Sequence, residues 1–516
     1  MSQWSSAKPR KVLAALEKIG WKVKRQTGSH KILERDGCDD YVFTFADNDL
    51  IEATKLTDIA KKTGLKPEDV KRAEIYYARM DEFWRKEQKL SCLEKFESLQ
   101  NVDWQEIQPD KKYIWLTNGM EDEFSEFISI GNKDSRSRQD DSVDSIFQVF
   151  SNGLHSSRDA WVYNFNSDEL SSNIQKTIDA YNEQVNRWNQ KGAKLTNADD
   201  FVTYDDSKIS WSSTLKIYLK RGVLNNYNSE QIRFALYRPF CKQFLYFDDT
   251  LNDRRGLFPY IFPNLEIEKK NQVICLTGSG SEKPFLVIGS NQISDLHLNG
   301  SGCTTQCFPF YFYDEDGTNR RENITDWALE QFQTHYQDPK ITKWDIFHYT
   351  YALLHHPHYR QRYAANLKRE LPRIPFAPEF HPFATAGKRL TEIHINYEQQ
   401  PEYRLKYIEN KDLPIDWRVE KMRLSKDKTQ IKYNDFLTLA GIPPETFEYK
   451  LGNRSALDWI IDQYQVSTDK RSGITNDPNR LDDEEYIVRL IKQVITVSLE
   501  TVKIVKGLSD LGIPKN

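Results

Sequence analysis

The sequence predicts an α+β protein, in which a small helix–strand–strand–strand–helix unit precedes a large mixed α/β region that ends in helices. Three observations lead to this prediction. Two short amphipathic helical patterns, near residues 8–19 and 53–63, enclose three runs of alternating polar and apolar residues. Aromatic-rich extended runs dominate residues 200–310, and helical spacing returns after residue 325. The chain of 516 residues is long enough for about three domains.

The first seventy residues contain every element of the small unit. The first helix has Pro9 near its start, Gly20 just past its end and an apolar face formed by Val12, Leu13, Leu16 and Ile19. A second helix over residues 53–63 is closed by Gly64. Between the two helices, alternating residues predict three strands, at 21–24, 31–34 and 41–45.

The rest of the chain is expected to change between helical and β-rich segments. One long, aromatic-rich helix is predicted for residues 73–96, and the polar residues 132–144 indicate a surface loop. The β-rich part should contain strands at 212–219, 244–247, 272–276 and 284–288. Helices are expected at 325–371, 455–464 and 483–505.

Charge and cysteine content narrow the class of protein. The net charge is −4, but residues 1–35 carry nine Lys or Arg against two Glu, a net +7 that favours contact with a polyanion. Because the six cysteines have no zinc spacing, we expect free thiols in a reducing compartment and no metal site. There is no long apolar segment and no apolar signal-peptide core, so we expect a cytoplasmic protein without membrane contact.

Residues 345–376, DIFHYTYALLHHPHYRQRYAANLKRELPRIPF, are the most informative stretch. Helical spacing predicts a helix that Pro357 breaks or restarts, then a second apolar stripe. Basic residues surround the second stripe: Arg360, Arg362, Lys368, Arg369 and Arg373. Two core helices with a solvated basic face account for the periodicity. The amino-acid sequence of the stretch also resembles a segment of the C-terminal specificity region of type ISP and related single-chain restriction–modification enzymes, the region that reads the DNA target.

Further runs extend this resemblance from about residue 73 to the end of the sequence. They occur in the order NGLHSSRDAWVYNF (152–165), YRPFCKQFLYFDD (237–249), DLHL (295–298) with CFPFYFY (307–313), and NRSALDWIIDQYQVSTDKRSGITNDPN (453–479). The resemblance implies that duplex DNA is a partner. Most aromatic residues in these runs should belong to the core, and Arg158 and Asp159 are expected to form an internal salt bridge. No base-reading residue can be assigned from the sequence.

A second resemblance covers residues 7–70. The run AKPRKVLAALEKIGWKVKRQTGSHKILERDG, followed by TDIAKKTGLKPEDV, is similar to HicA toxins, which are small ribonucleases with a double-stranded-RNA-binding-domain-like fold. The resemblance implies that His30 is catalytic, that RNA is the substrate and that a HicB-like antitoxin is a partner. The residues expected at the RNA are Lys22, Lys24, Arg25, Gly28, Ser29 and Lys31.

Two features leave the activity of this unit open. By itself, a Gly-Ser-His triplet is more typical of a turn with an ordinary histidine. In addition, Ala46 stands where HicA relatives often have a second histidine, in a pattern such as "FAFHD". Both an active and an inactive RNase unit are therefore compatible with the sequence.

Catalytic motifs that are absent from the sequence limit the functions that can be expected of it. The sequence has no Asn/Asp-Pro-Pro-Tyr loop for adenine methylation, no glycine-rich methyl-donor motif, no phosphate loop and no nuclease set, so no cofactor is expected. We expect a HicA-like unit at residues 1–72, followed at residues 73–130 by a helical remnant of the kind that follows the methyltransferase core in the resembled enzymes. A target-recognition region is expected at residues 131–450 and a C-terminal helical segment at residues 451–516. The leading hypothesis is a nucleic-acid-binding fusion. The alternatives are a specificity subunit that acts with a separate methyltransferase subunit, and a decayed gene fusion.

Overall fold

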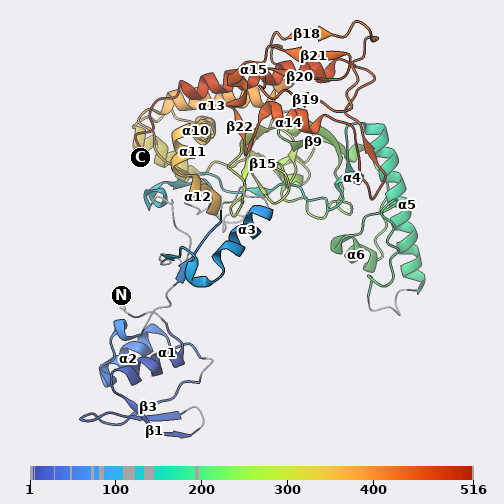
Figure 1. Cartoon of the computed structure of the whole chain (residues 1–516). Coiled ribbons are helices and arrows are strands. Elements are labelled where there is room, and N and C mark those ends of the chain that lie inside the picture. Colours follow the sequence, from blue (N-terminus) through green and yellow to red (C-terminus); the bar gives the residue numbers. More distant parts are fainter. Residues whose placement is uncertain are drawn as a thin grey trace. The chain divides into compact units, whose positions relative to one another are not determined.

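The computed structural model describes residues 4, 6–27, 30–46, 49–70, 75–80, 86–107, 122–132, 144–191 and 197–513. The chain forms two compact units, Met1–Thr117 and Asn118–Asn516 (Figure 1). Helices and strands are mixed in both units, which confirms the predicted α+β class.

The first unit begins with the predicted order of elements: α1 (Pro9–Lys18), β1 (Lys22–Thr27), β2 (His30–Glu34), β3 (Tyr41–Phe43) and α2 (Ala53–Thr63). The strands form an antiparallel sheet in the order β1-β2-β3, and Figure 1 shows both helices on one face of it. Trp21 is buried and its Nε1 donates to the carbonyl oxygen of Thr63 at 2.9 Å, which ties the sheet to the end of α2. Gly64 ends α2 with a φ of +73°, as its position in the sequence predicted.

The prediction of one helix over residues 73–96 is wrong. Ile75–Tyr77 form strand β4, which pairs antiparallel with β5 (Gln105–Ile107), and among the described residues of this range only Lys86–Phe96 form a helix, α3. Isoleucine and tyrosine favour extended backbone, and the pairing with β5 satisfies the backbone groups of β4. Tyr76 and Tyr77, which the prediction placed in a helix, therefore belong to a strand.

Two four-stranded sheets form the centre of the second unit. The first has the order β13-β9-β10-β8 and the second β12-β11-β14-β7. Alternate residues of β11 enter two different cores, with Val273 and Cys275 in one and Ile274 and Leu276 in the other. The second sheet therefore lies between the two cores. The strands are β7 (Ser151–Asn152), β8 (Tyr163–Asn164), β9 (Ile232–Arg238), β10 (Cys241–Tyr246), β11 (Val273–Thr277), β12 (Val287–Ser290), β13 (Ile293–Ser294) and β14 (Thr305–Pro309).

Smaller sheets complete the β structure of this unit. One four-stranded sheet has the order β18-β21-β20-β19, and the other sheets are strand pairs. Their strands are β6 (Ile128–Ser129), β15 (Tyr311–Phe312), β16 (Arg321–Glu322), β17 (Arg373–Ile374), β18 (Lys406–Glu409), β19 (Arg423–Leu424), β20 (Gln430–Lys432), β21 (Leu437–Ala440), β22 (Lys450–Leu451), β23 (Arg454–Ser455), β24 (Ser467–Thr468) and β25 (Thr475–Asn476).

The helices of the second unit confirm most of the helical predictions. The predicted restart at Pro357 is the boundary between α10 and α11, and the final predicted helices appear as α14 and α15. The helices are α4 (Asp159–Val162), α5 (Ser167–Lys191), α6 (Ser213–Lys220), α7 (Phe258–Ile261), α8 (Leu265–Glu268), α9 (Asp326–Tyr336), α10 (Lys343–His355), α11 (Pro357–Arg362), α12 (Ala364–Arg369), α13 (Phe380–Ile395), α14 (Ala456–Gln463) and α15 (Tyr486–Lys506).

The strand predicted at residues 212–219 is helix α6. The Ser212 side chain accepts a hydrogen bond from the backbone N–H of Leu215 and so caps the helix. Leu215 and Leu219, one helical turn apart, are both buried, whereas the alternate residue Ile217 is exposed. The spacing of the apolar residues is compatible with both a strand and a helix. The cap at Ser212 and the burial of Leu215 and Leu219 show that the segment is a helix. The loop predicted at 132–144 lies almost entirely outside the described residues.

Helices α10 and α13 approach each other very closely. A Cβ added to Gly387 of α13 would lie 1.8 Å from the backbone carbonyl oxygen of His348 on α10. No side chain fits at this crossing, so glycine lets the two helix backbones make contact.

A chain of hydrogen bonds crosses the core beside this contact. The backbone N–H of Gly289 donates to Tyr351 Oη at 2.6 Å, and Tyr351 Oη lies 2.6 Å from His394 Nδ1. His394 Nε2 lies 2.8 Å from Thr501 Oγ1. Burial lowers the pKa of His394 well below its usual value, so its ring is neutral. The chain links β12, α10, α13 and α15 through one uncharged histidine.

Two general expectations can also be compared with the described residues. All six cysteines are free thiols, as predicted. Within the described parts of the chain, no helix is both long enough and apolar enough to cross a membrane.

Candidate nucleic-acid interfaces

The β1–β2 hairpin carries the residues predicted to contact RNA. Thr27 lies opposite His30, and Arg25 lies opposite Ile32. Because side chains alternate between the two faces of a strand and paired residues share a face, His30 and Arg25 project from the same face. Leu33 is buried on the face that the helices cover, so His30 and Arg25 lie on the open face. His30 is exposed, and no described residue forms a hydrogen bond or ion pair with either side chain.

Lys24 and Lys22 lie farther along the same hairpin, next to acidic residues. Lys24 is at a β-bulge, and its Nζ lies 3.0 Å from the Asp40 carboxylate and 3.4 Å from that of Glu34. The hydrogen bond to Asp40 raises the pKa of Lys24. Lys22 is paired with Glu34 in the strand register. Both lysines therefore share their surroundings with carboxylates, unlike Arg25.

Lys31 and Ala46, which the sequence also singled out, do not share the open face with His30 in the way that Arg25 does. By strand alternation Lys31 projects from the helix-covered face, where it is paired with Phe43 of β3. Ala46 is exposed after β3, and its backbone N–H donates to Asp49 at 2.8 Å. Gly28 and Ser29 lie outside the described residues. The structure thus brings His30 and Arg25 together and separates Lys31 from them.

In the second unit, three of the sequence runs converge on one buried carboxylate. Asp295, from the run at 295–298, accepts hydrogen bonds from Tyr163 Oη at 3.2 Å and from Arg238 Nη1 at 2.8 Å. A Cβ added to Gly153 would lie 2.4 Å from the backbone carbonyl oxygen of Asp295, so the chain passes too closely for a side chain. Burial, followed by the nearby Asp159 carboxylate, raises the pKa of Asp295 to about 6. The cluster holds these segments in position.

Arg158, like the Asp295 cluster, holds segments of the protein in position. Its predicted salt bridge with Asp159 is wrong, because its guanidinium pairs with Asp253 at 3.2 Å. The Arg158 side chain is fully buried and also donates to Ser212 Oγ at 2.7 Å and to the Ser210 carbonyl oxygen at 3.2 Å. Its hydrogen-bonding capacity is used inside the protein, so Arg158 is not available to a DNA phosphate.

Several basic residues of 345–376 are also bonded to their own chain. Arg362 donates to the Glu123 carboxylate from Nε at 2.8 Å and from Nη2 at 2.6 Å. Arg373 donates to the carbonyl oxygens of Ser125 and Phe127, at 3.2 and 3.1 Å. The basic face predicted from periodicity therefore partly serves to anchor residues 123–127.

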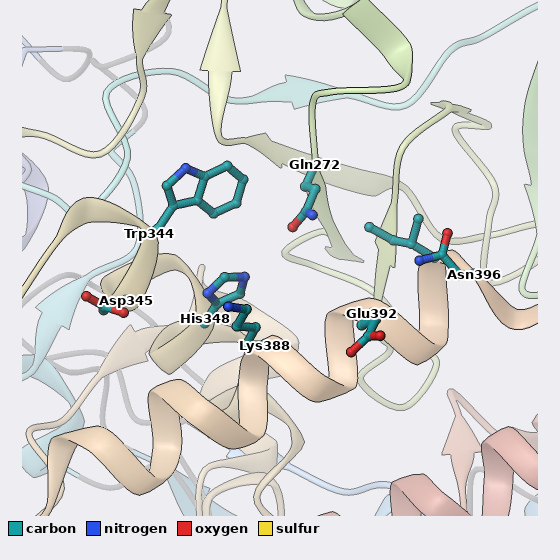
Figure 2. A pocket seen from close by; sticks show the side chains of 8 residues that line it. Gln272, Trp344, Asp345, His348, Lys388, Glu392 and Asn396 are labelled. Carbon is teal, nitrogen blue, oxygen red and sulfur yellow. The ribbon is translucent and has the colours of Figure 1, made fainter. Parts of the chain in front are cut away.

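A pocket that was not predicted from the sequence opens between the start of β11, α10 and α13. The pocket has a volume of about 480 Å³ (Figure 2). It is lined by Gln272, Trp344, Asp345, His348, Lys388, Glu392, Ile395 and Asn396. The only sign of this pocket in the sequence is the spacing of Trp344 and His348, which are four residues apart in a predicted helix and so lie on one face of it. Among the described residues, no group of three or more His, Cys, Asp or Glu side chains is placed to hold a metal ion.

Comparison with known proteins identifies both parts of the chain. Residues 145–491 match the model of the type ISP C-terminal specificity domain, and residues 9–65 match that of the HicA toxin of bacterial toxin–antitoxin systems. No curated protein matches significantly.

Solved structures of restriction–modification enzymes are similar to the chain. A nuclease-deletion mutant of the type ISP enzyme LlaGI, in complex with a DNA substrate mimic, is 33% identical, with a TM-score of 0.73 over 86% of this chain and 40% of that one. DrdV in a DNA complex is 34% identical, with a TM-score of 0.73 over 86% of this chain and 44% of that one. The ATP-dependent type ISP enzyme LlaBIII bound to DNA is 29% identical, with a TM-score of 0.74 over 86% and 28%.

This chain spans less than half of each of these enzymes. The specificity-domain match, however, covers more than half of its 516 residues. The chain therefore belongs to the type ISP specificity-domain family and combines that domain with a HicA-like domain.

Proposed function

We propose that the specificity domain recognises a sequence in duplex DNA and that this chain alone transfers no methyl group. The match over residues 145–491, together with the DNA-bound relatives, is the observation that carries the proposal. Enzymes that modify a base move it out of the helix into a pocket that holds its edge. The Asn/Asp-Pro-Pro-Tyr loop that would hold an adenine amino group is missing from this sequence.

The full chain is expected to bind duplex DNA and to leave it unmethylated. The measurement is a titration with labelled duplex, run in parallel with an assay for incorporation of a labelled methyl donor. Because phosphate contacts dominate such binding, affinity should fall as salt rises. Methyl incorporation by the purified chain would contradict the proposal. Incorporation that requires an added methyltransferase would instead support the role of a specificity subunit.

We further propose that the HicA-like domain cleaves RNA through His30. The match over residues 9–65 supports this proposal, as does the exposed position of His30 beside Arg25 on the open sheet face. In the proposed step the ribose 2′-oxygen attacks the adjacent phosphorus and the 5′-oxygen leaves. His30 accepts the proton of the 2′-hydroxyl and returns it to the leaving 5′-oxygen, so the products are a 2′,3′-cyclic phosphate and a 5′-hydroxyl, and the Arg25 guanidinium faces the phosphate. No metal takes part in this step.

Replacement of His30 with alanine is expected to abolish RNA cleavage by the full chain, because the proton then has no acceptor. The matched control is Lys62→Ala, an exposed position on α2, which should leave cleavage unchanged. RNA integrity and growth during controlled expression are the measurements. Cleavage that persists in His30→Ala, or that EDTA abolishes, would rule out this mechanism. If the wild type is inactive, Ala46→His should restore cleavage.

A further inference from the structure

The pocket between β11, α10 and α13 has an aromatic wall. Trp344 and His348 lie one turn apart on α10, with ring centroids 5.4 Å apart and planes inclined by 24°. Trp344 also stacks on Phe310, with centroids 3.6 Å apart and planes inclined by 13°. Figure 2 shows the two rings next to each other on the same side of the pocket. Because Phe310 and α10 hold the rings, this wall is set before any ligand arrives.

Polar side chains with unused hydrogen-bonding capacity stand around this wall. Gln272 Oε1 is buried and has no hydrogen-bond partner, and Figure 2 shows its amide directed toward the helices. Burial lowers the pKa of His348 to about 4, so its neutral ring offers one donor and one acceptor. Asn396 provides a further amide at the other end of the pocket. A buried acceptor without a partner is costly, and a bound ligand with a donor would remove that cost.

The charges in the pocket disfavour an anionic ligand. Asp345 and Glu392 carry two negative charges against the single positive charge of Lys388. The Asp345 carboxylate caps α10 by accepting from Thr342, and Glu392 pairs with Arg389 at 3.1 Å. A phosphate group is therefore not the feature that this pocket recognises. Its chemistry suits a neutral planar ring with donors and acceptors along its edge.

We propose that this pocket binds a purine base, with the ring against the Trp344–His348 wall and its polar edge toward Gln272 and Asn396. Its volume of about 480 Å³ is within the range of small-ligand sites, and it leaves room for the attached sugar. Stacking on an aromatic side chain accepts any purine, and the amides add hydrogen bonds to the base edge. The base comes either from a free nucleoside or from an unpaired nucleotide of DNA. The inference does not depend on the DNA-recognition proposal, because a free nucleoside tests it alone.

Calorimetric titration of the full chain with adenosine and guanosine tests the proposal. Saturable binding is expected, whereas ribose 5-phosphate, which has sugar and charge but no ring, should not bind. Gln272→Leu keeps the approximate size of the side chain and should weaken nucleoside binding by at least about tenfold. The control Thr385→Ala changes an exposed residue of α13 that does not line the pocket, and it should leave adenosine binding within about twofold.

A second arm separates the two sources of the base. A duplex with one unpaired adenine is compared with the fully paired duplex, in the wild type and in Gln272→Leu. A preference for the unpaired adenine that Gln272→Leu removes assigns the base to DNA, and nucleoside binding assigns it to a free metabolite. Either result supports the pocket. The proposal is overturned if neither the nucleosides nor the unpaired adenine bind in a way that depends on Gln272.

Discussion

The variant Gly387→Ala is expected to lose about 3 kcal/mol or more of folding free energy, at the upper end of the usual cost of overpacking. The added Cβ would lie 1.8 Å from the His348 carbonyl oxygen, which is backbone and cannot rotate away. Helices α10 and α13 would have to separate. Alanine is otherwise the better helix former, by about 1 kcal/mol, so the sign of the change tests the packing directly. The measurement is urea-induced unfolding of the variant and the wild type.

Thr385→Ala is the matched control for this experiment. Thr385 is exposed and lies two residues before Gly387 on the same helix. Its replacement should change the unfolding free energy by no more than about 0.5 kcal/mol. A Gly387→Ala variant as stable as the wild type would show that the two helices do not meet as described.

Acid is expected to destabilise the second unit through three buried histidines. Burial lowers the pKa of His348 to about 4, that of His355 to about 3 and that of His394 well below its usual value. In the unfolded chain each would titrate near 6.5. Below that pH the unfolded state binds protons that the folded state does not, so stability is fully present above about pH 6.5 and falls as pH decreases. At about pH 5 His348 and His355 each contribute a loss of about 2 kcal/mol, and His394 adds to the loss in the same direction.

His348→Gln tests the acid effect without breaking a hydrogen bond within the described structure, because His348 forms none there. Between about pH 5 and about pH 6.5, the variant should take up about one proton fewer on unfolding than the wild type does. The control His358→Gln removes a histidine from α11 that is only partly buried. Urea unfolding across this pH range measures both. An unchanged pH dependence in His348→Gln would mean that His348 is not buried as a neutral ring.

The small N-terminal unit could be predicted because its signals are local. Pro9 at the start of α1, Gly64 with positive φ after α2 and alternating strands between them each specify an element without reference to distant residues. The same local reasoning predicted the restart of the helix at Pro357. At residues 73–96 it failed, because the partner that makes Ile75–Tyr77 a strand lies about thirty residues later, in β5.

The candidate sites were predictable to a smaller degree. His30 was found because a short motif carries it, but the sequence could not show that Arg25 shares its face and Lys31 does not, since this depends on strand register. The partner of Arg158 is Asp253, which is 95 positions away in the sequence. The pocket of Gln272 and Trp344 also joins elements that only the fold brings together. Contacts of this kind require tertiary structure.

The most direct test of the central claim is a selection of duplexes from a random pool by the full chain, at low salt and then at rising salt. A specificity domain that reads DNA should enrich one sequence over competing duplexes, because contacts to base edges discriminate among sequences while phosphate contacts do not. The enriched duplex should remain bound at salt concentrations that release the unselected pool. A selection that enriches no sequence at any salt concentration would contradict DNA target recognition by this chain and would favour a decayed fusion.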